Sequence, residues 1–273
     1  HNMRYSIATV CLSGTLETKI AAISKAGFGF IEIFENDLVI SKNSPETIAA
    51  MINDAGLEII VYQPFRDFEG LTGKLRAKAF DRAERKFDLM TRLGTDLLMV
   101  CSSVHPAATP GISQVADDLH ELGERAAQRN MRVAYEALGW SHIVSDYRDS
   151  WEAVRRANHP ALGLCLDTFH IYSRETEIDS IANIPSEKIF LVQIADAPKL
   201  SMDPLSWSRH HRCFPGQGQL DLDKFMSQLR RTGYDRALSL EIFNDQFRAG
   251  NADSIALDGH RSLIYLNRSP DKK

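Results

Sequence analysis

The sequence contains no long hydrophobic run, since no stretch approaches the roughly 20 consecutive apolar residues that a membrane-spanning helix needs. It also lacks an excess of positive charge: the net charge of −4 at pH 7 gives no reason to expect a nucleic acid or an anionic membrane as partner. The opening HNMRYSIATV has neither the basic region nor the apolar core of a secretory signal. We therefore expect a cytoplasmic protein, and we expect His1 and Asn2, which precede Met3, to be left over from cloning.

Cysteine is scarce and scattered. The four cysteines, Cys11, Cys101, Cys165 and Cys213, stand singly, with no CxxC pair among them. Neither a disulfide framework nor a thiolate metal site is indicated. Three of the four lie in or beside apolar, strand-like runs, so we expect free buried thiols in a reducing compartment.

Nucleotide-binding signatures and domain linkers are missing as well. No G-x-G-x-x-G or P-loop follows the first strand-like segment, and no low-complexity stretch divides the chain. The hydrophobic content of 44% and the charged content of 25% are ordinary values that allow a sizeable core. A chain of 273 residues is either one large domain or two small ones, and α/β barrels of about 250 residues are single domains.

What the sequence does contain is a regular alternation of strand-like and helix-like segments. Between the strands, apolar residues recur every three to four positions. Gly27, Gly56, Gly94 and Gly233 fall where helices would stop, and Ser44-Pro45 falls where one would start. Eight such units favour an α/β fold of the (β/α)8 TIM-barrel type, in one domain over residues 1–273, rather than a doubly wound sheet. The predicted strands are 5–9, 28–34, 57–62, 96–102, 132–137, 162–167, 189–196 and 237–243.

Four polar residues close the last four apolar runs: Glu136, Asp167, Gln193 and Glu241. Catalytic groups of TIM barrels sit at the carboxyl ends of strands, so these side chains are expected along one arc of the barrel. Three carboxylates in so small a space must hold protons or bind a cation. Four oxygen donors without a thiolate favour Mg²⁺ or Mn²⁺ over Zn²⁺. The alternative for Asp167 is a carboxylate that caps the next helix.

Further polar residues follow these strand ends. His170, three positions after Asp167, is either a structural histidine or a proton-transfer group beside the metal. The stretch WSRHHRCFPGQGQLD (207–221) is either a solvated basic loop or a functional loop that carries Ser208 and Arg212 over the pocket. In YQPFRDFEG (62–70), Arg66 either pairs with a neighbouring carboxylate on the loop or binds a ligand.

These motifs resemble a known family. PGQGQLD (215–221) matches a late motif of the xylose-isomerase-like TIM barrels, and YQPFRDFEG, CLDTFHIYSR, FLVQIADAPK and HHRCFPGQGQLD resemble those of the bacterial 3-dehydroshikimate dehydratases. The resemblance covers Met3 to about Leu266. In two-domain members a dioxygenase-like portion follows the barrel, so such a domain is an implied partner; a homo-oligomer stays open.

The resemblance implies a divalent metal, Mg²⁺ or Mn²⁺ with Co²⁺ as an alternative, on the four strand-end residues selected above. It also implies that Arg66, His170, Ser208 and Arg212 face the substrate, 3-dehydroshikimate. The product is protocatechuate, in quinate and shikimate breakdown, and His170 is expected to act as base or acid. Arg66 is expected to bind the substrate carboxylate, with Phe65 and Phe68 as apolar walls for the ring.

Two other functions are compatible with the same barrel. A metal-dependent sugar isomerase or epimerase would need no carboxylate-binding arginine and could use Glu136 and Glu241 as opposed bases. Gln193 stands where such enzymes commonly have histidine, which argues against that function. A non-catalytic barrel, kept as an interaction module, is disfavoured by the intact set of candidate metal ligands.

Overall fold

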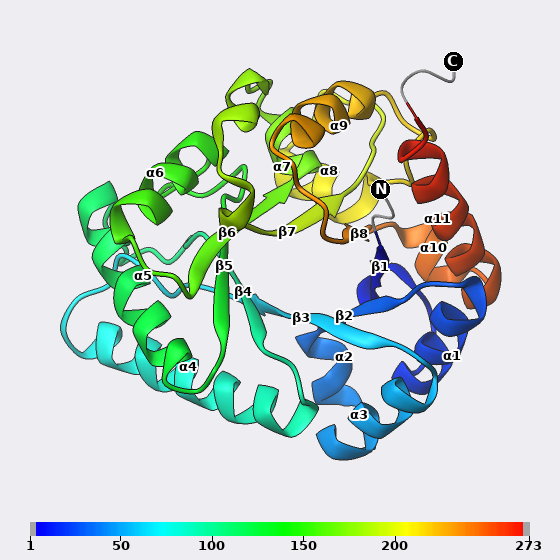
Figure 1. Ribbon diagram of the computed structural model, residues 1–273, viewed down its shortest axis with the longest axis horizontal. Helices are drawn as coiled ribbons and strands as arrows, with labels where there is room; N and C mark the ends of the chain where they lie inside the picture. The colour runs from blue at the N-terminus through cyan, green and yellow to red at the C-terminus, as the bar shows by residue number, and fades with distance from the viewer. Residues whose placement is uncertain (1–3, 270–273) are drawn as a thin grey trace.

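The computed structural model describes residues 4–269, so the expectation for His1 and Asn2 lies outside the described residues. Eight parallel strands pair in chain order, and β8 pairs with β1 to close the barrel (Figure 1), which confirms the predicted TIM barrel. The strands are β1 (Tyr5–Ala8), β2 (Phe30–Phe34), β3 (Glu58–Phe65), β4 (Leu97–Cys101), β5 (Arg132–Glu136), β6 (Leu162–Asp167), β7 (Ile189–Ile194) and β8 (Leu238–Leu240).

Helices surround the barrel on all sides in Figure 1. Two predicted helix signals are seen directly: Ser44 Oγ accepts the Thr47 N–H at 3.1 Å, and Gly94, with φ of 74°, ends the longest helix. The α-helices are α1 (Leu16–Ala26), α2 (Glu35–Ile40), α3 (Pro45–Asp54), α4 (Gly73–Leu93), α5 (Ile112–Ala127), α6 (Tyr147–Ala157), α7 (Thr168–Ser173), α8 (Pro204–His211), α9 (Leu222–Arg231), α10 (Asp245–Ala249) and α11 (Ala252–Leu266).

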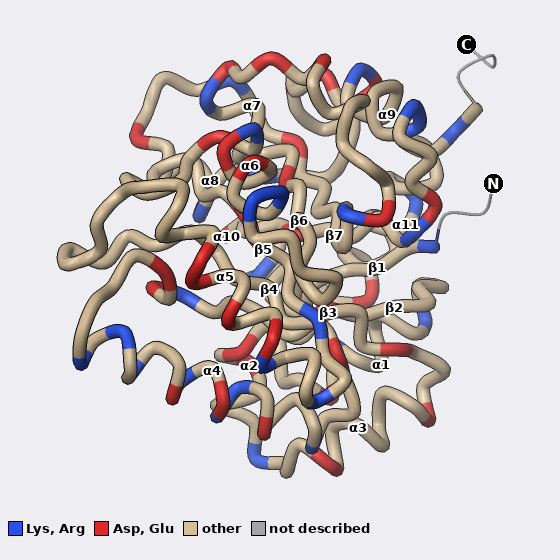
Figure 2. The backbone as a smooth tube through the Cα atoms, turned by 60° about the vertical axis from the view of Figure 1, so that its left-hand side comes forward, with Lys and Arg blue, Asp and Glu red and all other residues tan. Residues whose placement is uncertain are grey.

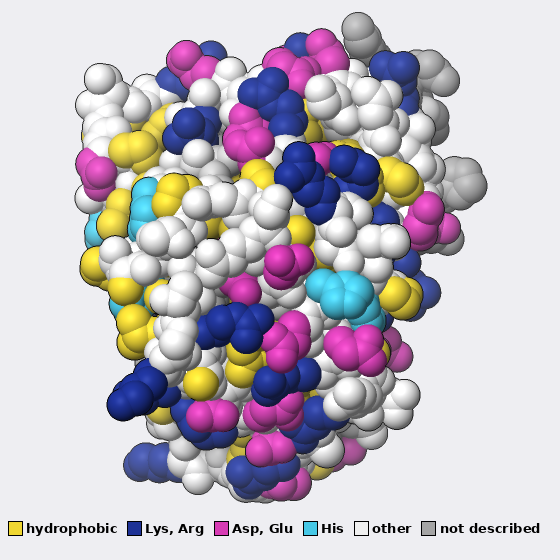
Figure 3. Space-filling view, turned by 90° about the vertical axis from the view of Figure 1, so that its left-hand side faces the viewer, with side chains coloured by type: hydrophobic (Ala, Val, Ile, Leu, Met, Phe, Trp, Pro, Cys, Tyr) yellow, Lys and Arg dark blue, Asp and Glu magenta, His cyan; other side chains and the backbone are white. Residues whose placement is uncertain are grey.

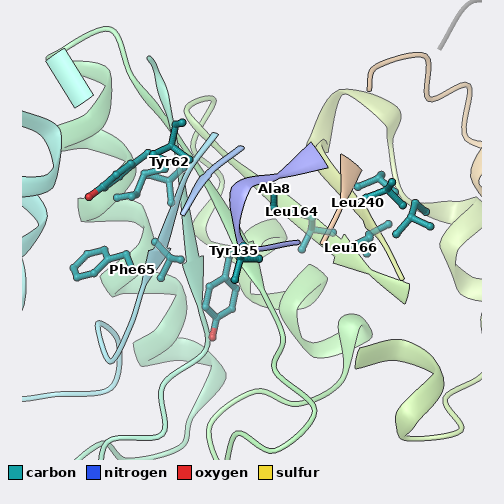
Figure 4. Packing of buried hydrophobic residues seen from close by; sticks show 14 of the residues in the cluster. Ala8, Tyr62, Phe65, Tyr135, Leu164, Leu166 and Leu240 are labelled. Atoms are coloured by element: carbon teal, nitrogen blue, oxygen red, sulfur yellow. The ribbon is translucent and has the colours of Figure 1, made fainter. Parts of the chain in front are cut away.

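Apolar strand residues are buried on both faces of the sheet, as expected for parallel strands under a layer of helices. In β4, for example, all five residues are buried. Figure 4 shows part of this packing, with Tyr62 and Phe65 on one side of the view and Leu166 and Leu240 on the other. The four cysteines are free and buried, as predicted.

The outer surface carries charges of both signs. Figure 2 shows Lys and Arg alternating with Asp and Glu along the outer helices, and Figure 3 shows them intermixed on one face. Among residues 4–269, no helix combines the length and apolar character needed to cross a membrane.

The PGQGQLD segment is held against the end of β7 by one buried side chain, that of Asp196. Its two carboxylate oxygens accept four backbone N–H groups at 2.8–3.1 Å, from Ala197, Gly216, Gly218 and Leu220. A side chain on Gly218 would fall against the Asp196 carboxylate, and its Cβ would lie only 2.6 Å from the Ala197 backbone. The motif is therefore a tightly packed turn.

The ends of this segment are also anchored. The backbone of Asp196 exchanges two hydrogen bonds with Cys213, of 2.9 and 2.8 Å, immediately after Arg212. At the other end, Asp221 Oδ1 accepts the Lys224 N–H at 3.1 Å and caps α9. The segment thus fixes where the chain bearing Arg212 crosses the mouth of the barrel.

Candidate active site

The structure places the four predicted strand-end residues together at one mouth of the barrel. Glu136 ends β5, Asp167 ends β6 and is in register with Gln193 of β7, and Glu241 directly follows β8. All four are buried. Glu136, Asp167 and His170 offer ligand atoms within 4.8 Å of one another.

The guanidinium of Arg212 lies among these carboxylates. Its Nη1 is 3.0 Å from Asp167 Oδ2 and 3.5 Å from Glu241 Oε1. Nε and Nη2 donate to Ser208 Oγ at 3.1 and 2.8 Å, so Ser208 holds the guanidinium in place. Because the side chain is only 1% exposed, these contacts are shielded from solvent.

The carboxyl groups of this cluster titrate differently. Burial, reinforced by Asp167, raises the pKa of Glu136 well above its usual value, and burial raises the pKa of Glu241 to about 7 despite Arg212. Burial alone would also raise the pKa of Asp167, but Arg212 outweighs it and the pKa lies below its usual value. One arginine cannot compensate three buried carboxylates, so the cluster favours either protons or a further positive charge.

Asp167 serves two purposes. Its Oδ1 accepts the backbone N–H groups of Phe169 and His170 at 2.8 and 3.2 Å, which caps α7 as the alternative interpretation predicted. Its Oδ2 faces Arg212. The cap fixes the carboxylate and also sets the position of His170 relative to it.

His170 is buried beside the carboxylates. Burial lowers its pKa to about 4, against the opposing influence of Asp167, so the ring is neutral. Nδ1 accepts the Gly139 N–H at 3.1 Å, and Nε2 lies 3.4 Å from Arg212 Nη2, which is also a donor. Nε2 lies 3.9 Å from Glu136 Oε1. A histidine that binds a metal through Nε2 needs its hydrogen on Nδ1. The Gly139 N–H that points at Nδ1 therefore argues against His170 as a ligand.

A cavity opens above the cluster. Besides Glu136, His170, Ser208, Arg212 and Glu241, it is lined by Gln63, Pro64, Arg66, Met99, Cys101, Leu138, Trp140, Arg209 and Phe243. The ring of Trp140 meets that of His170 edge to face, with centroids 5.1 Å apart. Trp140 does not close an apolar run and was not predicted, and Arg209 was predicted only as part of the basic stretch 207–221.

Arg66 reaches this cavity from an anchored loop. Its own carbonyl and that of Asp67 accept from Arg82, at 2.9 and 2.8 Å. Asp67 Oδ1 is occupied by the Val104 N–H at 3.1 Å, and Glu69 Oε2 accepts the Ser103 N–H at 3.1 Å. Among the described residues, Arg66 forms no ion pair with either neighbouring acid, so its charge is directed to the cavity.

Glu69 anchors the same loop to the interior of the protein. It is fully buried, and its Oε2 accepts from the Ser103 N–H at 3.1 Å and from the Tyr135 hydroxyl. Burial raises the pKa of Glu69 to about 7, even with these two donors. This carboxyl joins the loop after β3 to β5 and to the segment after β4.

The prediction that Phe65 and Phe68 form walls for a substrate ring is wrong. Neither lines the cavity; both are buried, with ring centroids 5.4 Å apart, and the Arg82 guanidinium lies 5.2 Å from the Phe65 centroid. The register of β3 against β4 shifts between Tyr62 and Phe65, which interrupts the alternation of side chains. Phe65 therefore points outward on the side of Tyr62 (Figure 4).

A second polar layer, which the sequence analysis missed, lies inside the barrel. Glu32 of β2 is fully buried and accepts from Gln63 Nε2 at 3.2 Å, Gln193 Nε2 at 2.9 Å and the Ser239 hydroxyl. Burial and the nearby Glu241 raise the pKa of Glu32 to about 8. A charged residue within the apolar run FGFIEIF was the signal that could have revealed this layer.

The donor set fits a hard divalent cation. Glu136, Asp167 and Glu241 supply carboxylate oxygens and Gln193 supplies an amide oxygen, which are the ligand types that Mg²⁺ and Mn²⁺ prefer. The position of Arg212 between two of these carboxylates shows that they stabilise a positive charge. Burial raises the pKa of the neighbouring Cys165 thiol well above its usual value.

The barrel and its arc of buried carboxylates define the class. The sequence profile of the xylose isomerase-like TIM barrel family matches residues 20–266, and the chain belongs to this family. It is 53% identical to a 3-dehydroshikimate dehydratase of Pseudomonas putida over 97% of this chain and 42% of that protein. It is 29% identical to a 3-dehydroshikimate dehydratase of Neurospora crassa over 86% of this chain and 83% of that protein.

A solved structure gives the same result. A fusion of a xylose isomerase-like TIM barrel with a 4-hydroxyphenylpyruvate dioxygenase superposes with a TM-score of 0.95 at 53% identity. The match covers 97% of this chain and 43% of the fusion protein. The chain therefore spans less than half the length of these bacterial and fused relatives.

Proposed function

We propose that this chain is a metal-dependent dehydratase that converts 3-dehydroshikimate to protocatechuate and water. One observation carries the proposal: buried oxygen donors, a neutral histidine and cavity-facing arginines converge on one mouth of the barrel. The relatives at 53% identity support the choice of substrate. The substrate is a carboxylated cyclohexenone, so it offers an anionic group for the arginines and vicinal oxygens for a metal.

We assign the metal to Glu136, Asp167, Gln193 and Glu241, with Mg²⁺, Mn²⁺ or Co²⁺ as the ion. When bound, a divalent ion supplies Lewis acidity that stabilises negative charge developing on the ketone oxygen. The chain itself supplies a dry pocket, because all four side chains are buried. Electrostatic stabilisation is worth more there than in water.

Arg66, Ser208 and Arg212 are assigned to substrate binding. Arg66 lines the cavity at its rim and can offer two parallel N–H groups to the substrate carboxylate. Arg212 brings a second cation to the interior end of the same cavity, and Ser208 orients it through two hydrogen bonds. The two arginines would fix both the position and the tilt of the ring.

His170 is assigned to proton transfer. The reaction removes a proton from the carbon between ketone and leaving group, releases the adjacent hydroxyl as water, and ends with tautomerisation to the aromatic ring. Because the Gly139 N–H occupies Nδ1, transfer must run through Nε2. Nε2 lies 3.9 Å from Glu136 Oε1 and 3.4 Å from Arg212 Nη2, so it is the ring nitrogen that faces the proposed site.

The test is turnover of 3-dehydroshikimate, followed by the ultraviolet band of the catechol acid. The protein is assayed as purified, after chelation, and after each of Mg²⁺, Mn²⁺ and Co²⁺ is added back. We expect protocatechuate to form, chelation to abolish the activity and at least one of the three ions to restore it. Turnover of ketoses without turnover of 3-dehydroshikimate would instead identify a sugar isomerase or epimerase.

A further inference from the structure

The inner polar layer around Glu32 lies where it can set the orientation of the proposed metal ligands. Glu32 is fully buried in the middle of β2, and it is not among the residues that line the cavity. It cannot touch a substrate bound there. Its three donors come from three other strands, through Gln63, Gln193 and Ser239, so it connects the two sides of the barrel interior.

The contacts of Gln193 decide which way its amide points. Nε2 lies 2.9 Å from Glu32 Oε1 and 3.1 Å from Glu241 Oε2. If the amide were turned by half a rotation, its oxygen would face two carboxylate oxygens and both hydrogen bonds would be lost. Glu32 Oε1 and Glu241 Oε2, which both accept from Nε2, therefore keep the nitrogen on the inner side.

The oxygen of Gln193 is consequently directed to the other side. Oε1 lies 3.5 Å from the Cys165 sulfur, which itself lies 3.7 Å from Glu136 Oε2. Gln63 extends the same arrangement, since its Nε2 donates both to Glu32 at 3.2 Å and to Glu241 Oε2 at 2.5 Å. One buried carboxylate thus organises an amide and, through Gln63, a second carboxylate.

We propose that Glu32 is a positioning residue for the metal site, which fixes Gln193 with its oxygen toward the ion and holds Glu241 in place through Gln63. The inference rests on the metal assignment of the proposed function. Residues that orient metal ligands in this way typically contribute 10–100-fold to metal affinity.

The test is the affinity of the full chain for Mn²⁺, measured by electron paramagnetic resonance without substrate. In Glu32→Gln the new amide can present either its oxygen or its nitrogen to Gln193. The orientation of the Gln193 amide is then no longer fixed by this contact. We expect the Kd for Mn²⁺ to rise about 10–100-fold. Ser239→Ala is the matched control: it removes a donor to Glu32 and leaves the contact with Gln193, so we expect a change of less than about threefold.

A double-mutant cycle separates positioning from a general structural role. In a Gln193→Ala background, Glu32→Gln should cost far less affinity than it does alone, because its main target is gone. An unchanged Kd in Glu32→Gln, or an equal loss in both backgrounds, would overturn the proposal. If circular dichroism shows that Glu32→Gln does not fold, Glu32→Asp keeps the charge and shortens the reach, and wild-type affinity in that variant overturns the proposal equally.

The same measurement distinguishes this inference from the proposed function. Wild-type protein that binds Mn²⁺ and responds to Glu32→Gln, yet leaves 3-dehydroshikimate unchanged, would support the positioning role and refute the dehydratase. Wild-type protein that binds no Mn²⁺ and is activated by none of Mg²⁺, Mn²⁺ and Co²⁺ would refute both.

Discussion

Replacing Asp196 with asparagine should destabilise the protein strongly, although the two side chains have the same shape. The carboxylate accepts four backbone N–H groups, two on each oxygen. Asparagine offers one oxygen, so two of these donors would face an amide nitrogen instead. A buried donor left without a partner costs about 1–3 kcal/mol, so we expect the free energy of unfolding to fall by about 2–6 kcal/mol.

Urea unfolding followed by far-ultraviolet circular dichroism measures this loss. Asp221→Asn, at the far end of the same segment, is the control, because asparagine is about as good a helix N-cap as aspartate and should cost less than ~0.5 kcal/mol. We also expect Asp196→Asn to lower kcat/KM, since the backbone of Asp196 pairs with Cys213 beside Arg212. A stability equal to that of the Asp221→Asn variant would refute the reasoning.

Three further predictions concern packing, pH and substrate binding. Gly218→Ala should cost about 1–3 kcal/mol of stability by overpacking, whereas Gly29→Ala, where nothing lies within 4 Å of the added carbon, should change it by less than ~0.5 kcal/mol in the same urea assay. The raised pKa of Glu69, about 7 against 4.5 when unfolded, means that the folded state binds more protons between these values, so stability falls as pH rises through this window. Glu69→Gln removes this pH dependence, so the free energy of unfolding of the variant relative to wild type should improve by about 3 kcal/mol from pH 4 to pH 8. A difference between variant and wild type that does not change with pH would contradict the raised pKa of Glu69. Arg66→Ala should raise the KM for 3-dehydroshikimate about 10–100-fold, and a KM equal to that of wild type would remove Arg66 from the binding site.

Much of the fold could be predicted because it depends on local patterns. Parallel strands covered by helices appear as continuous apolar runs, and all eight were found with bounds that differ by at most three residues at either end. The four strand-end residues could be selected because the carboxyl ends of barrel strands meet at one rim. The contact between Asp167 and Arg212 could not be predicted, since it joins residues 45 positions apart.

The errors and omissions have local physical causes too. Phe65 was assigned to the pocket because it precedes Arg66 directly, but the register of β3 shifts between Tyr62 and Phe65 and the side chain points outward. Glu32 was not predicted because it lies within its strand, whereas the predicted metal ligands were chosen because they close apolar runs. The contacts of His170 come from the Gly139 backbone, 31 residues away, and from Arg212, 42 residues away, and no local side-chain pattern encodes them.

The four buried thiols make the barrel its own reporter of opening. Cys11 follows β1, Cys101 lies in β4, Cys165 in β6 and Cys213 beyond β7, and burial raises the pKa of each thiol. Cys101 lines the cavity, so a disulfide reagent can approach it in the closed barrel. Cys11 and Cys165, which are 0% and 2% exposed, can react only when the elements around them separate. If these two thiols react at one rate, the barrel opens as a unit, whereas a faster thiol would mark the strand that separates first.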